Sequence, residues 1–70
     1  MIAGYVNEQL GEAYTQLSDL ASAAAAYEAA LNTATSASNV AALREKLALT
    51  YRQLGKPAQA LAQYEAILSF

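Results

Sequence analysis

The sequence predicts an all-α protein made of two copies of a helical hairpin. When residues 1–33 are placed over residues 38–70, a shift of 37 positions, twelve pairs are identical. The alanine content alone would give roughly four such pairs, so the chain repeats itself once. Apolar residues recur at the three- and four-residue spacing of a helix, with no alternating strand pattern. Ala, Glu, Lys, Leu and Arg make up about half of the chain, a composition that favours long helices.

Apolar stripes and turn residues predict four helices. They are expected at about residues 2–17, 20–33, 40–54 and 57–69. The short connections between them make neighbouring helices antiparallel. Ser and Asp side chains at the first turn, Ser18 and Asp19, can accept hydrogen bonds from the free N–H groups of the second helix.

The remaining two connections carry unequal signals. Gly55 suits the left-handed end of the third helix, and Pro57 suits the first turn of the fourth. Residues 34–39 contain neither Gly nor Pro, and Ser38 or Asn39 is the expected N-cap. This stretch therefore allows either a turn or a continuous helix that would swap a helical pair between two chains. The compact form is favoured.

The repeated residues resemble the tetratricopeptide repeat family, whose pattern contains L-G-x2-Y followed by A-x3-F. The resemblance implies a right-handed α-solenoid fragment in a single domain, residues 1–70, with repeats at about 4–37 and 41–70. It also implies that the first helix of each repeat lines a concave face. The residues expected to pack the repeats are Leu10, Gly11, Tyr14, Ala23, Tyr27, Ala30, Leu47, Ala48, Tyr51, Ala60 and Tyr64.

The same resemblance implies a peptide-binding groove on the first and third helices. The candidate groove residues are Tyr5, Glu8, Gln9, Glu12, Gln16, Glu45, Lys46, Leu49, Arg52 and Gln53. Acidic residues in the first half and basic residues in the second would orient a peptide of mixed charge. Some family members grip a C-terminal carboxylate with Lys, Asn and Arg, but Glu8 and Glu12 occupy those places here. The alternative is an ordinary solvated surface, acidic at Glu8 and Glu12.

The composition argues against a catalytic or metal site and is consistent with a protein that binds other proteins. The chain has no Cys and no His, which removes thiolate and imidazole metal ligands and the commonest general base. We therefore expect no catalytic residues, metal or cofactor. A net charge of −2 argues against nucleic acid, and no apolar run is long enough for a membrane span. A soluble scaffold that binds a protein or peptide is the expected function. The sequence leaves the compartment unknown, with the cytoplasm favoured.

A structural or assembly role is the competing interpretation. Two repeats leave two apolar ends without a polar cap, and repeat arrays commonly need at least three repeats. Leu61, Leu68 and Phe70 are expected to lie exposed at the C-terminal end and to mediate self-association. A closed twofold dimer is the arrangement expected from the sequence.

Overall fold

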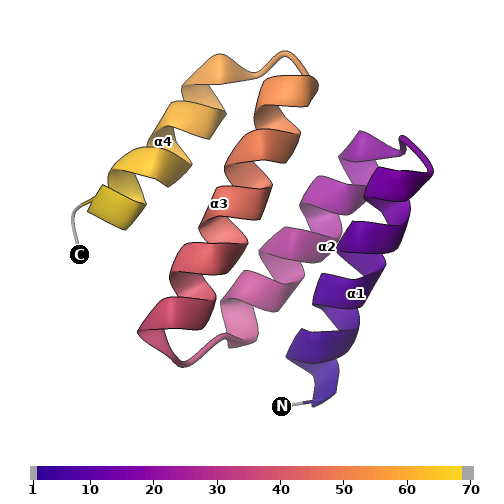
Figure 1. Cartoon of the computed structure of the whole chain (residues 1–70), viewed down its shortest axis with the longest axis vertical. Helices are drawn as coiled ribbons and strands as arrows, with labels where there is room; N and C mark the ends of the chain where they lie inside the picture. The colour runs from indigo at the N-terminus through magenta and orange to yellow at the C-terminus, as the bar shows by residue number, and fades with distance from the viewer. Residues whose placement is uncertain (1, 69–70) are drawn as a thin grey trace.

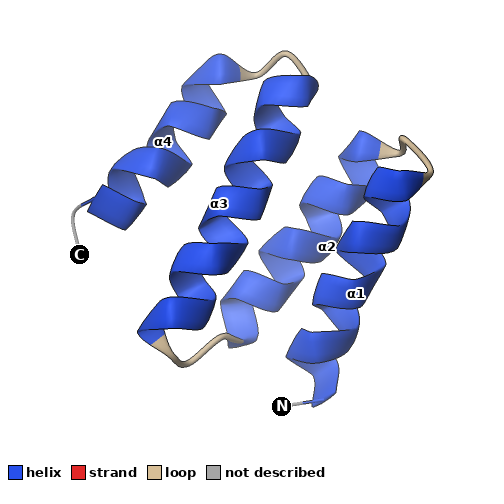
Figure 2. Ribbon diagram, viewed as in Figure 1, coloured by secondary structure: helices blue, strands red, loops and turns tan. Residues whose placement is uncertain are grey.

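The computed structural model describes residues 2–68, with side chains from Val6 onward, and it contains four α-helices and no strand in that range. The helices are α1 (Ile2–Gln16), α2 (Leu20–Thr33), α3 (Ala37–Gln53) and α4 (Pro57–Leu68). They run alternately up and down and lie side by side in chain order (Figures 1 and 2). The Cα atoms span 29 × 27 × 13 Å, and the shortest extent matches two layers of packed helices. The predicted all-α fold is confirmed.

The turns that close the two hairpins have the same geometry. Ser18 and Gly55, 37 positions apart, both adopt a positive φ, 62° and 76°. In the first turn the amide of Asp19 donates to the carbonyl of Tyr14 at 2.9 Å, and the equivalent bond closes the second turn at the same length. This bond, with a left-handed residue before it, is the Schellman motif. Asp19 then caps α2 by accepting from the amide of Ser22 at 3.3 Å, as the sequence predicts.

The connection between the hairpins is shorter than the sequence predicted. Helix α3 begins at Ala37, because the extended backbone at Ser36 lets its side chain accept the amide of Asn39 at 3.2 Å. The expected N-caps, Ser38 and Asn39, therefore lie inside the helix. Extended backbone at Ala34 separates α2 from α3, so the structure shows the compact form and not a continuous helix.

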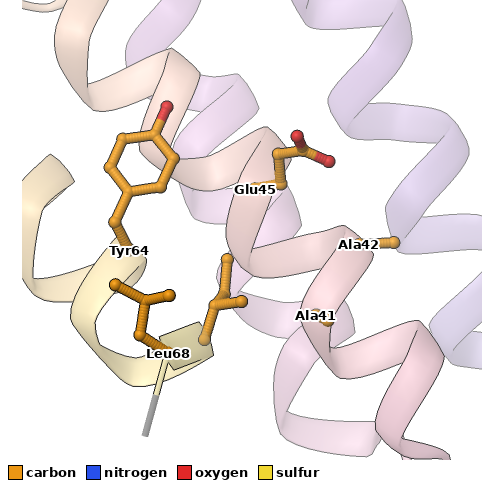
Figure 3. A pocket seen from close by; sticks show the side chains of 6 residues that line it. Ala41, Ala42, Glu45, Tyr64 and Leu68 are labelled. Atoms are coloured by element: carbon orange, nitrogen blue, oxygen red, sulfur yellow. The ribbon is translucent and has the colours of Figure 1, made fainter. Parts of the chain in front are cut away.

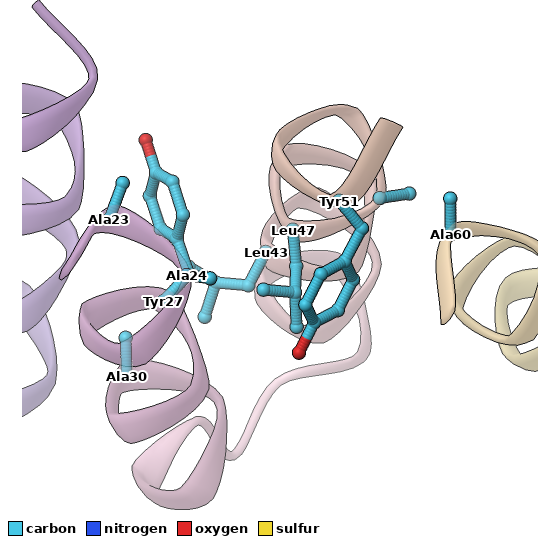
Figure 4. Close-up of a cluster of buried hydrophobic side chains, with 9 residues drawn as sticks. Ala23, Ala24, Tyr27, Ala30, Leu43, Leu47, Tyr51 and Ala60 are labelled. Carbon is cyan, nitrogen blue, oxygen red and sulfur yellow. The ribbon is translucent and has the colours of Figure 1, made fainter. Parts of the chain in front are cut away.

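The core is built from small residues against a few large ones. Its buried apolar cluster comprises Ala23, Ala24, Tyr27, Ala30, Leu43, Leu47, Ala48, Tyr51 and Ala60 (Figure 4). Gly11 has no side chain because the ring of Tyr27 occupies that space. A Cβ at Gly11 would lie 2.5 to 2.8 Å from three atoms of the ring. Helix α2 therefore approaches α1 as closely as the two backbones and the ring allow.

A hydrogen bond between Tyr51 and Glu28 joins the two hairpins at the edge of this core. Tyr51 on α3 is buried, and its hydroxyl donates to the carboxylate of Glu28 on α2. Burial, together with this negatively charged acceptor, raises the pKa of Tyr51 to about 12. The phenol therefore stays neutral and remains a donor at physiological pH.

The apolar stripe of α1 is less buried than the sequence predicted. Leu10 was expected in the repeat packing, but it is 42% exposed, whereas its counterpart Leu47 is 1% exposed. Val6 and Leu17 are exposed as well. Leu47 is covered because α3 packs on α2, while α1 has no helix packed on its other side among the described residues. Tyr14 and Tyr64 are half-buried and pack against the core.

Replacing Gly11 with Leu tests the close contact between α1 and α2. The new side chain must displace a buried ring, so we expect a loss of roughly 1–3 kcal/mol in the free energy of unfolding. Ala13→Leu, at an exposed position on the same helix, is the control. Thermal unfolding should give a clearly lower Tm for Gly11→Leu than for Ala13→Leu. Equal Tm values would contradict the assigned packing.

The two Schellman turns give a matched pair of substitutions. Ser18 holds a left-handed conformation that favours glycine, so Ser18→Gly should stabilise the protein by about 0.5–1 kcal/mol. Gly55→Ala should destabilise it by about 1 kcal/mol, although nothing lies within 4 Å of the added Cβ, because the backbone conformation itself is strained. Denaturant unfolding measures both. Changes of the same sign would show that the turn conformation does not set the effect.

Candidate functional site

Helices α1 and α3 are joined on one face by a three-residue charge cluster. Lys46 Nζ lies 2.7 Å from Glu8 Oε2 and 2.7 Å from Glu12 Oε2. The two carboxylates stand one helical turn apart on α1, so a single ammonium group from α3 reaches both. Glu8 and Glu12 therefore share a cation and do not form the simple acidic surface that was the alternative prediction from the sequence. The side chains of Lys46, Glu8 and Glu12 remain 34%, 30% and 43% exposed.

The electrostatics of this charge cluster do not match those of an acid–base pair. The hydrogen bonds from Lys46 to Glu12 and Glu8 raise its pKa well above the usual lysine value and outweigh the opposing effect of partial burial. Lys46 therefore stays charged, and the cluster carries a net charge of −1. General acid–base work by two carboxylates needs them in different environments. Here both share one lysine and both are partly solvated.

A hollow lies next to the charge cluster along α3. Leu49, Arg52 and Gln53 line a depression of about 230 Å³. Leu49 is exposed one turn beyond Lys46 and offers an apolar surface. Arg52 is exposed too and forms no ion pair with the residues that the structure describes. The α1/α3 face thus combines an acidic cluster, an apolar side chain and an unpaired cation within two turns of α3.

The other candidate groove residues are dispersed. Gln9 and Gln16 are exposed on α1, and the side chain of Tyr5 lies outside the described residues. Glu45 lines a second, larger hollow of about 630 Å³ between α3 and α4 (Figure 3). Its walls are Ala41, Ala42, Glu45, Tyr64, Ile67 and Leu68. This hollow was not predicted from the sequence, although the internal repeat contained the signal for it.

Neither a metal cluster nor a membrane-spanning helix occurs in the described part of the chain. Within it, no three His, Cys, Asp or Glu residues gather closely enough to hold a metal ion. None of its helices is both long and apolar enough to cross a membrane.

Removing the central cation tests the charge cluster. In Lys46→Met the two carboxylates are left unpaired one turn apart, so we expect a loss of roughly 1 kcal/mol in the free energy of unfolding at low salt. Salt screens such pairs, so the difference from the unmodified protein should shrink at 1 M NaCl. Because the folded-state pKa of Lys46 is raised, its contribution is fully present below the ordinary lysine pKa and declines above it. Lys56→Met, in the second hairpin turn, is the control.

The family of the chain follows from comparison with known proteins. A family model described as tetratricopeptide repeat matches residues 5–35 and again residues 41–70. No curated protein and no solved structure matches the chain. The two matches cover most of the sequence, and each coincides with one helical hairpin. Members of this family generally act as protein–protein interaction modules and are typically not enzymes. The chain belongs to the tetratricopeptide repeat family and contains two of its repeats.

Proposed function

We propose that the protein is an interaction module whose α1/α3 face binds an extended segment of a partner protein. The observation that supports this most directly is the position of the charge cluster, Glu8, Glu12 and Lys46, beside the hollow at Leu49, Arg52 and Gln53. The ion pairs hold α1 against α3, so the binding surface is organised before a ligand arrives. Preorganisation of this kind lowers the entropic cost of binding.

The size of the hollow favours a peptide over a small molecule. Pockets for drug-sized ligands usually enclose about 300–1,000 Å³ and bury most of the ligand. The hollow at Leu49 is about 230 Å³ and is open to solvent, so it has room for a single side chain. A peptide can place one apolar side chain there and make its other contacts along the two helices.

The charges on this face specify the polarity of that peptide. Arg52 has no partner among the described residues and suits an acidic side chain beside the apolar one. The charge cluster keeps a net charge of −1 and suits a basic side chain farther along, towards α1. Lys46 is already engaged by both carboxylates, so Arg52 is the cation on this face that is left for the ligand. Such charges set orientation and specificity more than affinity.

A selection from a random library tests this proposal. Twelve-residue peptides displayed on phage are selected against the 70-residue protein, and the affinities of the enriched peptides are measured by fluorescence anisotropy. Enriched peptides should carry an acidic residue next to an apolar one. Arg52→Glu should weaken them roughly 3- to 10-fold. Lys56→Glu makes the same change in net charge in the second hairpin turn and should leave affinity within twofold.

Two results would overturn the proposed site. The first is equal weakening by Arg52→Glu and Lys56→Glu, since that would reflect net charge and not the face. The second is a set of amide chemical-shift changes confined to α2 and α4 when an enriched peptide is added. Shift changes centred on residues 46–53 and on the facing turns of α1 are the expected result.

A further inference from the structure

The α3/α4 hollow repeats a surface that is already occupied inside the molecule. Counting back 37 positions from its lining residues leads to Gly4, Tyr5, Glu8, Tyr27, Ala30 and Leu31. Tyr27 and Ala30 are buried in one cluster with Leu43 and Leu47 of α3. Glu8 on α1 pairs with Lys46, which also lies on α3. In the first repeat, therefore, this surface holds α3. In the second repeat it is open, and Leu68 at its edge is 83% exposed.

The side chains that would fill the hollow also exist in the chain, and they are exposed. Helix α3 docks on the first hairpin through Leu43 and Leu47. Their counterparts 37 positions earlier are Val6 and Leu10 on α1, which are 47% and 42% exposed. Leu17, the counterpart of half-buried Leu54, is exposed as well. Helix α1 thus carries the docking residues of α3 without a surface to dock on.

We propose that the protein self-associates head to tail, with α1 of one copy docked in the α3/α4 hollow of the next. The arrangement reproduces between two copies the packing that already joins the two repeats within one copy. It covers Val6 and Leu10 on the first copy, and Tyr64, Ile67 and Leu68 on the second. The contact uses the same helix positions as an interface that the fold has already formed once within the chain.

The polar part of the internal interface changes at this junction. Inside the chain Lys46 pairs with Glu8 and Glu12. Between copies Gln9, the counterpart of Lys46, would face Glu45, the counterpart of Glu8. Leu49 would replace Glu12. The junction therefore keeps the apolar contacts and loses the ion pairs, which makes it weaker than the internal interface and dependent on concentration.

The symmetry of the assembly follows from the docking surfaces. Because the two surfaces differ, each copy uses one and leaves the other open, and such heterologous contacts build open chains unless the rotation closes a ring. This differs from the closed twofold dimer that the sequence suggested. Of the three residues expected to mediate contact, Leu68 lines the hollow, Leu61 is exposed outside it, and Phe70 lies beyond the described residues.

Gln9 and Glu45 provide a charge test of the junction. Sedimentation velocity is run on the whole chain from 10 µM to 1 mM, with circular dichroism to verify folding of each variant. Gln9→Lys restores a cation opposite Glu45 and should strengthen association roughly 3- to 10-fold. Gln9→Glu should weaken it by a similar factor. In the double variant Gln9→Glu with Glu45→Lys, association should recover.

Two further variants separate the junction from general effects. Asn32→Lys makes the same change in net charge at an exposed site on α2, which takes no part in the junction, and it should leave association unchanged. Leu68→Glu changes a highly exposed wall of the hollow and should reduce association without unfolding the protein.

Three outcomes would overturn the proposal. One is a monomer at every concentration for both the unmodified protein and Gln9→Lys. Another is an equal effect of Gln9→Lys and Asn32→Lys. The third is saturation at a dimer with no larger species, which would indicate the closed twofold arrangement. The proposed peptide-binding function is judged separately, since it depends on Arg52 and not on Gln9 or Leu68.

Discussion

The docking of α3 on the first hairpin is the interaction on which the rest of the structure depends. Each hairpin buries one apolar face between its own helices and leaves another face to be covered. Leu47 is the only large side chain, among the described residues, that is less than 2% exposed. It lies in this contact between α3 and the first hairpin. Domains of this size rarely obtain more than about 3–5 kcal/mol from one core. Without the contact between α3 and the first hairpin, the protein would separate into two hairpins, each too small to stay folded.

The contact between α3 and the first hairpin also positions the charged residues on the α1/α3 face. Lys46 joins Glu8 and Glu12 only because Leu43 and Leu47 bring α3 against the first repeat. The face that we propose for partner binding thus depends on core packing. A substitution in the core would also change the arrangement of the residues on this face. In this small protein, stability and recognition depend on one helix–helix contact.

The sequence predicted the helices well because the repeat and the apolar period are local signals. It placed Asp19 at the start of α2 for the same reason. The errors arose where the outcome depended on distant residues or on backbone detail. As serines, Ser36 and Ser38 have the same ability to cap a helix. Ser36 is the N-cap because its backbone is extended. Lys46 pairs with Glu12 and Glu8, which lie 34 and 38 positions away in the sequence. The apolar pattern of a single helix cannot predict such a pairing.

The positive φ at Ser18 has a consequence for motion as well as for stability. Local opening begins where packing is thinnest and backbone strain is highest. Helix α1 is covered by α2 alone over most of its length and ends in a left-handed serine, whereas the second hairpin has glycine at that place. We therefore expect backbone amides of α1 to exchange with solvent faster than those of α3. Such local opening would reach Glu8 and Glu12, the partners of Lys46, while α2 and α3 keep their shape.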